Sequence, residues 1–248
     1  MKKILLIIIG LLPAMRIKNI LLNTLGCNIS LSAHLAPLIL TTNSVYVGDQ
    51  VRIGLLNYIN CKRLVLRKKS RIGKLNIISG NISFALASRA SIGNMNIFRR
   101  APFPLNQGAC KFYMGEGSNC TGWHRYDMTR SIMIGRETVI GGSGTQIWTH
   151  GFYHGVGQSK ERIRVDGKVR IGDFNYIGTK CIINPGVTTT QEVTIGSGAV
   201  VSKSIYEPGI YVTQGLRKLD KTFDESLENL TEDIGHPCHT RVFVKKDA

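Results

Sequence analysis

A six-residue repeat constrains the fold of this chain more than any other feature of its sequence. Between residues 165 and 201 an aliphatic residue stands at nearly every sixth position, with Thr189 as the one weak unit: Val165, Ile171, Ile177, Ile183, Ile195 and Val201. This period matches neither an α-helix, with about 3.6 residues per turn, nor the alternation of a simple strand. It predicts a solenoid, in which each unit buries its aliphatic side chain only against the units above and below it.

Glycines extend the repeat toward the N-terminus. Glycine directly follows Ile134 and Ile140, and a looser version of this pattern runs between residues 47 and 93. Glycine at such positions indicates turns that crowd a Cβ atom or need unusual backbone angles. We therefore predict an all-β chain of three parts: a hydrophobic or amphipathic segment over 1–30, a solenoid over 31–206, and a closing region over 207–248 with a short acidic helix at 220–234. Within the solenoid we expect irregular coils over 45–97, an inserted loop over 100–131, and regular coils over 132–206 with a projecting loop over 146–164.

Two segments carry a resemblance to a known family. They are "NYIGTKCIINPGV" at 175–187 and "IGSGAVVSKSI" at 195–205. With them the chain resembles the hexapeptide-repeat acyltransferases, in the branch of sugar and antibiotic O-acetyltransferases. The resemblance is close from residue 134 to about 218, loose over 45–97 and absent at both ends. It implies a left-handed parallel β-helix with three six-residue sides per coil, a homotrimer with active sites between subunits, and acetyl-CoA as co-substrate without a metal.

The six-residue register breaks between residues 145 and 165, in a segment that contains His150 and His154. In the family that the chain resembles, a histidine on an excursion ahead of the last coils is the catalytic base. That position falls on His150, and His154 stays open as the alternative. The chemistry also favours histidine, because an imidazole with a pKa of about 6.5 can take a proton from a hydroxyl and return it to a thiolate near neutral pH.

A second cluster, "GEGSNCTGWHRYD", occupies residues 115–127. By position it corresponds to the region that contributes acceptor-binding residues in the family, and His124 is a candidate there as base or acceptor ligand. Aromatic rings can stack on a sugar, and amides or carboxylates can bind its hydroxyls. The candidates for acceptor binding are Trp123, Tyr126, Trp148 and Asn119, with Asp127 as a further hydroxyl contact. A glycine-rich loop packed on a neighbouring subunit stays open as the alternative.

The resemblance places coenzyme A along the last coils. Small residues there leave room for the pantetheine arm, and cations can bind the phosphates. Tyr176 stands where the family has a tryptophan. The other candidates for coenzyme A binding are Gly178, Thr179, Lys180, Gly196, Ser197, Ala199, Lys203, Arg217 and Lys218.

Positive charge is concentrated in the first half of the chain. The formal net charge is +16, and residues 1–111 hold 16 basic residues and one acid, Asp49, a net of 16 − 1 = +15. A basic half favours an anionic partner, but we expect no nucleic acid, because no motif that reads it is present. Together with the resemblance, this predicts an acetyl-CoA-dependent O-acetyltransferase that acts on a sugar hydroxyl of an anionic surface polysaccharide, capsular or similar. Two alternatives stay open: an acetyltransferase of a small acceptor, such as a nucleotide-linked sugar or an antibiotic, and a non-catalytic β-helix that binds a polyanion or a membrane.

The N-terminal segment is strongly apolar. "ILLIIIGLL" at residues 4–12 follows two lysines, but it is shorter than the about 20 residues that span a bilayer. A second apolar group over 17–25 fits one face of a helix. We favour an uncleaved segment of a cytoplasmic protein, in peripheral contact with the inner membrane, over a cleaved secretory signal. A segment buried in a subunit interface stays open as the alternative.

Overall fold

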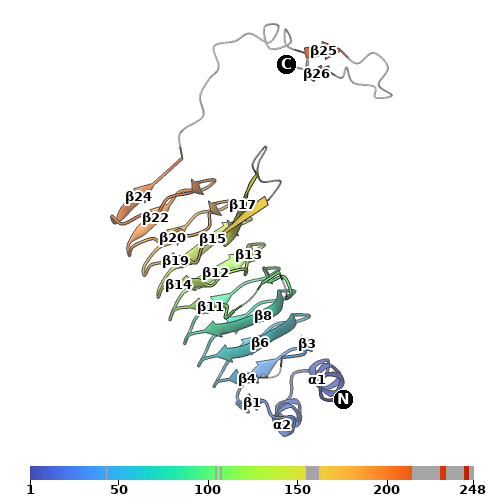
Figure 1. Cartoon of the computed structure of the whole chain (residues 1–248). Helices are drawn as coiled ribbons and strands as arrows, with labels where there is room; N and C mark the ends of the chain where they lie inside the picture. Colours follow the sequence, from blue (N-terminus) through green and yellow to red (C-terminus); the bar gives the residue numbers. More distant parts are fainter. Residues whose placement is uncertain are drawn as a thin grey trace. The chain divides into compact units, whose positions relative to one another are not determined.

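The described part of the chain folds mainly into a solenoid of parallel β-strands (Figure 1). The computed structural model describes residues 1–42, 44–103, 105–106, 108–154, 162–213, 230–232 and 243–245. By its internal contacts the chain divides into two units, Met1–Thr213 and Gln214–Ala248. In the second unit, β25 (Leu230–Glu232) pairs antiparallel with β26 (Phe243–Lys245). The predicted helix over 220–234 is therefore wrong at β25, and the rest of that range lies outside the described residues.

The strands of the first unit stack in three faces. The first face contains β3 (Ile39–Leu40), β10 (Ile97–Arg99), β13 (Arg125–Asp127), β16 (Gln146–Ile147), β21 (Ile182–Ile183) and β23 (Val200–Val201). The second face contains β1 (Asn28–Ile29), β4 (Ser44–Val47), β11 (Lys111–Met114), β14 (Ile132–Ile134) and β19 (Val169–Ile171). Two long strands, β6 (Tyr58–Leu66) and β8 (Ile77–Leu86), belong to both of these faces. The third face is a separate sheet of β2 (His34–Leu35), β5 (Arg52–Ile53), β7 (Arg71–Ile72), β9 (Ser91–Ile92), β12 (Asn119–Gly122), β15 (Val139–Ser143), β20 (Tyr176–Ile177), β22 (Val193–Ile195) and β24 (Gly209–Tyr211).

Each six-residue unit corresponds to one face of the solenoid. Ile171 lies on the second face, Ile177 on the third and Ile183 on the first, and all three side chains are buried in the core. β20 pairs with β22 in the next coil, where Tyr176 lies opposite Thr194, 194 − 176 = 18 residues later. A coil therefore takes three units, and the predicted all-β parallel solenoid is confirmed.

The boundaries of the solenoid differ from the prediction in three places. At the C-terminal end, β24 pairs with β22, so the third face continues past residue 206, where the closing region is predicted to begin. Val165 is 40% exposed and belongs to a projecting hairpin, so the repeat of the last coils begins only at β19. At the other end, β1 already pairs with β4, which places the start of the first coil before residue 31.

The coils between residues 45 and 97 are regular, although irregular ones are predicted. Arg52 pairs with Arg71, and Arg71 pairs with Ser91, which gives coils of 71 − 52 = 19 and 91 − 71 = 20 residues. One or two residues are thus added to each coil. The added residues hide the six-residue period in the sequence, but the strands keep their register.

Close stacking of the coils explains the glycines that follow the aliphatic residues. A Cβ atom at Gly54 would lie 2.6 Å from the carbonyl oxygen of Gly73 in the next coil. We expect Gly54→Ala to lower the free energy of unfolding by about 1–3 kcal/mol, because the coils must move apart to admit the methyl group. Urea denaturation measures this loss. Gly151→Ala is the matched control, since nothing lies within 4 Å of a Cβ atom there; equal losses in both variants would contradict the explanation.

The inserted loop is shorter than the predicted range of 100–131. Only the stretch between β10 and β11 leaves the solenoid, and β11, β12 and β13 then form a complete coil. Aromatic rings stack inside this coil and its neighbours: Phe84 on Phe112, with ring centroids 4.8 Å apart, and Phe98 on Tyr126, at 4.3 Å. Residues 111–127 are therefore part of the solenoid and not of an inserted loop.

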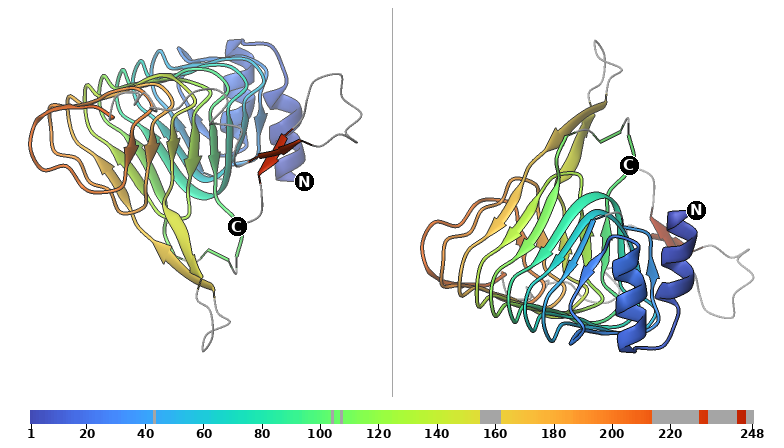
Figure 2. Two further views of the ribbon diagram at one scale, coloured as in Figure 1. Left: turned by 90° about the horizontal axis from the view of Figure 1, so that it is seen from above. Right: turned by 90° about the horizontal axis from the view of Figure 1, so that it is seen from below.

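Two helices cover the N-terminal end of the solenoid, α1 (Lys2–Gly10) and α2 (Arg16–Thr24) (Figure 2). Their inner sides bury Leu6 and Leu22 completely. The N-terminal segment is thus built into the fold along one side of each helix. Within the described residues, no helix has the length and hydropathy needed to cross a membrane.

A buried lysine fastens this end of the chain. Lys18 of α2 is fully buried, and burial lowers its pKa to about 8. Its Nζ lies 2.7–3.1 Å from four backbone carbonyl oxygens, those of Gly10, Leu12, Leu35 and Ala36. One side chain therefore joins α1, the turn after it and the first coil.

Candidate active site

Two excursions leave the solenoid at the same edge, where the first face meets the second. One is the stretch between β10 and β11. The other is an antiparallel hairpin of β17 (His150–His154) and β18 (Arg162–Asp166), inserted between β16 and β19 and seen projecting in Figure 2. They are in contact, because Arg164 Nη1 donates a 2.6 Å hydrogen bond to the carbonyl oxygen of Leu105. The hairpin lies where the sequence predicts a projecting loop.

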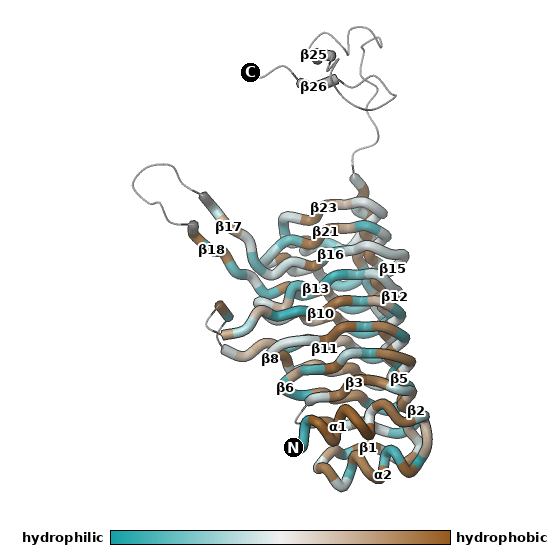
Figure 3. Tube along the Cα trace, turned by 90° about the vertical axis from the view of Figure 1, so that its right-hand side faces the viewer, coloured by the Kyte–Doolittle hydropathy of each residue, from teal (hydrophilic) through white to brown (hydrophobic). Residues whose placement is uncertain are grey.

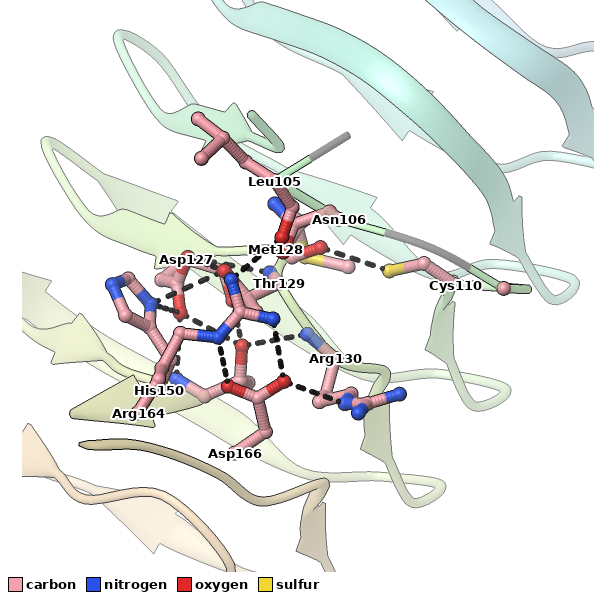
Figure 4. A network of polar contacts seen from close by, with 12 residues as sticks. Leu105, Asn106, Cys110, Asp127, Met128, Thr129, Arg130, His150, Arg164 and Asp166 are labelled. Carbon is pink, nitrogen blue, oxygen red and sulfur yellow. Dashed lines mark hydrogen bonds and ion pairs between the residues drawn. The ribbon is translucent and has the colours of Figure 1, made fainter. Parts of the chain in front are cut away.

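His150 begins this hairpin, and its side chain meets Asp127 of the preceding coil (Figure 4). The distance from His150 Nδ1 to Asp127 Oδ2 is 2.7 Å. β13 and β16 are neighbours in register, with Tyr126 opposite Ile147, so both strands end at this edge. Stacking of the coils therefore brings a carboxylate beside an imidazole that is 23 residues away in sequence.

Further hydrogen bonds hold the Asp127 carboxylate. The amide and the hydroxyl of Thr149 donate to Oδ2 at 2.9 and 2.8 Å, and the hydroxyl of Thr129 donates to Oδ1 at 2.9 Å. Burial by itself would raise the pKa of Asp127, but hydrogen bonds from His150, Thr149 and Thr129 outweigh burial and lower this pKa below its usual value. Asp127 is therefore ionised at neutral pH.

The ionised carboxylate fixes the tautomer of His150. A carboxylate only accepts hydrogen bonds, so Nδ1 carries the proton that it donates to Asp127. Thr129 Oγ1 lies 3.1 Å from the same nitrogen. Within the described part of the chain, the hydrogen bonds of this ring involve Nδ1 alone. The neutral ring thus keeps a free lone pair on Nε2, and the side chain is 27% exposed.

A second carboxylate fixes the start of the hairpin. Asp166 lies opposite His150 across the hairpin and forms ion pairs with Arg130 at 3.0 Å and Arg164 at 2.9 Å. The backbone N–H of Arg130 also donates to the hydroxyl of Thr149 at 2.9 Å. These contacts join the hairpin to the preceding coil, so His150 is held at the base of the hairpin and not at its tip.

A cavity of about 520 Å³ opens beside His150, a volume in the range of small-molecule sites. Trp148 and Phe152 stand edge-on to the imidazole, with ring centroids 6.2 and 5.6 Å from its own. Arg99 and Arg125, exposed on neighbouring strands of the first face, also line it. The cavity therefore combines a base, aromatic rings and positive charge.

Two of the predicted site residues are buried in the core of the solenoid. His124 is fully buried, its Nδ1 accepts a hydrogen bond from the Thr145 amide at 3.1 Å, and burial lowers its pKa to about 4. The Tyr126 ring is 2% exposed and stacks on Phe98, while its hydroxyl lies 2.8 Å from Cys120 Sγ. The prediction of His124 as acceptor ligand or alternative base is therefore wrong. Tyr126 lines the cavity beside His150 although its ring is buried, so its contact with an acceptor stays a prediction.

The remaining acceptor candidates lie in different places. Trp148 lines the cavity. Asn119 lies on the third face, where its side-chain oxygen accepts a 2.8 Å hydrogen bond from Ser91. Trp123 is 65% exposed at the turn from the third face to the first, and neither it nor Asn119 lines the cavity. The side chain of His154, the other alternative base, lies outside the described part of the structure.

The residues predicted to bind coenzyme A follow a different edge, where the third face meets the first. Tyr176 of β20 is 45% exposed, and Gly178, Thr179 and Lys180 form the turn after this strand. Gly196 and Ser197 occupy the same turn in the next coil. Gly178 is required by stacking itself, because a Cβ atom would lie 2.7 Å from the backbone nitrogen of residue 197.

Four further candidates for coenzyme A have other positions. Ala199 is 7% exposed, with its side chain in the core, and its role beside the pantetheine arm stays a prediction. Lys203 is exposed just after β23. Arg217 and Lys218 lie outside the described residues. Among the described residues, no group of three or more histidine, cysteine, aspartate or glutamate side chains is arranged to hold a metal ion.

Three residues of the site are not identified by sequence reasoning. From the sequence, Asp127 is expected only to bind an acceptor hydroxyl, and Arg99 and Arg125 carry no expectation. The alternation along β13 contains the missing signal, because a buried Tyr126 directs its neighbours Arg125 and Asp127 outward. This signal becomes readable once residues 125–127 are recognised as a strand.

No protein-family model matches the chain, and no curated protein matches it. Among solved structures it is similar to a maltose O-acetyltransferase from Clostridium difficile 630, with 26% identity over 44% of this chain and 60% of that chain and a TM-score of 0.36. It is also similar to the polysialic acid O-acetyltransferase OatWY (19% identity, 81% of this chain, 92% of that chain, TM-score 0.39). A third similar structure is the D94N mutant of AntD, an N-acyltransferase from Bacillus cereus in complex with dTDP and coenzyme A (17% identity, 72% of this chain, 88% of that chain, TM-score 0.36). The chain spans less than two thirds of the maltose O-acetyltransferase. The chain is thus similar to acyltransferases, as the resemblance in its six-residue repeat predicts.

Proposed function

We propose that this protein is an acetyl-CoA-dependent O-acetyltransferase that modifies a hydroxyl group of an anionic sugar polymer. The observation that carries this proposal is the His150–Asp127 pair, 2.7 Å apart, at the mouth of a cavity with exposed arginines. Acyl transfer to an alcohol needs a group that removes the hydroxyl proton during attack, and a neutral imidazole with a free nitrogen meets this need.

The proposed mechanism is direct transfer. His150 Nε2 takes the proton of the acceptor hydroxyl while its oxygen attacks the thioester carbonyl, and Asp127 stabilises the imidazolium that forms. When the carbon–sulfur bond breaks, His150 returns this proton to the departing thiolate. The hydroxyl proton thus ends on the thiol, and the electron pair of the broken carbon–sulfur bond stays on sulfur. No acyl-enzyme intermediate forms, and the histidine is neutral again.

The surroundings of His150 favour an anionic sugar as acceptor. Within the described residues, neither Arg99 nor Arg125 forms an ion pair with an acidic side chain, and both are exposed. Trp148 and Phe152 offer apolar ring surface of the kind on which sugars stack. OatWY, one of the similar proteins, is itself described as a polysialic acid O-acetyltransferase. We therefore propose carboxylate-bearing sugars as the substrate class.

Donor binding is proposed along the edge that carries Tyr176, Thr179 and Lys180. Their exposed turn leaves space for a pantetheine arm, and Lys180 and Lys203 can bind phosphate. Within one chain, the edge proposed to bind coenzyme A is not the edge that carries His150. We therefore propose that a neighbouring subunit supplies the donor edge, in a homotrimer with active sites between subunits. We also propose that the coil is left-handed. Size-exclusion chromatography with light scattering should then give a mass of three times the 27.4 kDa of one chain.

Thiol release from acetyl-CoA tests the proposal with three acceptors: sialic acid oligomers, oligogalacturonate and neutral malto-oligosaccharide. We expect release with an anionic acceptor and a KM that rises with salt, because charges at an exposed site are screened. Arg99→Gln/Arg125→Gln should raise this KM by about tenfold with little change in kcat. Arg52→Gln/Arg71→Gln, on the third face, is the control with the same charge change. Release with the neutral acceptor alone would contradict the anionic substrate, and no release with any sugar would contradict the activity.

A further inference from the structure

The outer sides of the two N-terminal helices form an exposed apolar surface. On α1 and at the residue that directly follows it, the exposed apolar residues follow helical spacing at Ile4, Ile8 and Leu11, and on α2 they follow it at Ile17, Ile20 and Leu21. Figure 3 shows α1 as a mostly brown, hydrophobic helix at this end of the solenoid and α2 in a mixture of brown and teal. We call these six residues the cap surface. The opposite sides of the same helices are buried, so the cap surface is what remains after the helices have packed on the coil.

All six side chains of the cap surface are exposed. Ile4, Ile8 and Ile17 are 62%, 57% and 62% exposed, and no described residue covers them. Single exposed apolar residues are normal on a protein surface, but a continuous group of them is typical of a binding surface. We therefore expect the cap surface to bind a partner.

The charges around the cap surface are all positive. Lys2 and Lys3 are exposed at the start of α1, and Arg16 is exposed at the start of α2. The first acidic residue of the chain is Asp49, which is bonded to Ser30 and Ser32 in the first coils. The neighbouring coils continue the pattern, since residues 1–111 carry a net charge of 16 − 1 = +15.

We propose that the cap surface binds an anionic lipid membrane, with α1 and α2 lying in the plane of the interface. Apolar side chains on one side of a helix and flanking lysines or arginines are the combination that such surfaces bind. Each helix has nine residues, so it rests on the bilayer without spanning it. Charge also selects between occupants. A second copy on this face would bring two strongly basic ends together, whereas acidic headgroups neutralise them.

Flotation of the purified full chain with vesicles tests this proposal. We expect binding to phosphatidylcholine vesicles that contain about one third phosphatidylglycerol, and at least tenfold weaker binding to phosphatidylcholine alone. Raising the ionic strength should weaken the binding to the anionic vesicles. Lys2→Gln/Lys3→Gln/Arg16→Gln should reduce the affinity for them by about a hundredfold, since each basic residue near the surface contributes about 1 kcal/mol.

Ile8→Glu/Ile17→Glu tests the apolar contribution and should reduce vesicle binding by more than tenfold. Both side chains are more than half exposed, so the fold should persist, which circular dichroism checks. Val200→Glu/Ile210→Glu is the matched control, because these residues are 61% and 78% exposed in the last coils and carry the same charge change. Wild-type protein that fails to float, or Ile8→Glu/Ile17→Glu that floats as wild type does, would overturn the proposal. If the wild type self-associates without binding vesicles, and Ile8→Glu/Ile17→Glu loses this self-association, the occupant of the cap surface is a second copy and the membrane proposal is overturned.

Discussion

Replacing His150 with alanine is expected to lower kcat for acetyl transfer by about 10²–10⁴-fold, the range that a general base contributes. The free Nε2 is the atom that removes the acceptor proton, and no other imidazole lines the cavity among the described residues. KM for the acceptor should change little, because Arg99, Arg125 and Trp148 remain. Initial rates of thiol release at saturating acetyl-CoA measure this change.

The control for this variant is His34→Ala. His34 is an exposed histidine on the third face, away from the cavity, so its loss should leave the rate unchanged. His150→Ala should also keep the thermal unfolding temperature of the wild type within a few degrees, because the ring projects from the base of the hairpin. A kcat equal to that of the wild type in His150→Ala would remove this residue from the mechanism.

Asp127→Asn is expected to lower kcat by about 10²-fold or more. The amide keeps the shape of the carboxylate but removes the negative charge that stabilises the imidazolium. Its NH₂ group can also face Nδ1 and favour the wrong tautomer. The pH–rate profile separates this positioning role from a structural one. The pKa of Asp127 is lowered in the folded protein, so its charge is present throughout the neutral range. Without this charge, kcat should stay low across the neutral range, because the imidazolium that forms during transfer has lost its anionic partner.

Asp173→Asn is the matched control for Asp127→Asn. Asp173 forms an exposed ion pair with Arg136 at 3.0 Å, outside the cavity, so it loses the same charge without touching His150. We expect its rate and pH profile to equal those of the wild type. A normal rate in Asp127→Asn anywhere in the neutral range would contradict the role given to the carboxylate.

The solenoid can be predicted from the sequence because its stabilising contacts repeat. Ile171, Ile177 and Ile183 each fill the same place on successive faces, so the period of the sequence equals the period of the structure. The position of His150 can also be predicted, since the hairpin interrupts this period. Asp127 is harder to predict, because the coil that joins it to His150 is longer than three six-residue units: Tyr126 lies opposite Ile147, 147 − 126 = 21 residues later.

Glycine and polar residues are dense in residues 115–127, so the sequence there does not distinguish a loop from a coil. Cys120 and Tyr126 face inward, and the Asn96 side chain accepts a hydrogen bond from the His124 backbone N–H at 3.0 Å. A buried histidine paired with backbone groups has the same sequence appearance as a ligand in a loop. Only the register of the coil, with Arg125 opposite Ile97, distinguishes the two.

The measurement that tests the central claim most directly is the tautomer of His150 in the folded protein. Nitrogen-15 chemical shifts of its ring at neutral pH distinguish a protonated nitrogen from a free one, and His150→Ala assigns the signals. The structure predicts a proton on Nδ1, held by Asp127, and an unprotonated Nε2. A neutral ring with its proton on Nε2 would contradict the claim, because this histidine could then not take a proton from the acceptor.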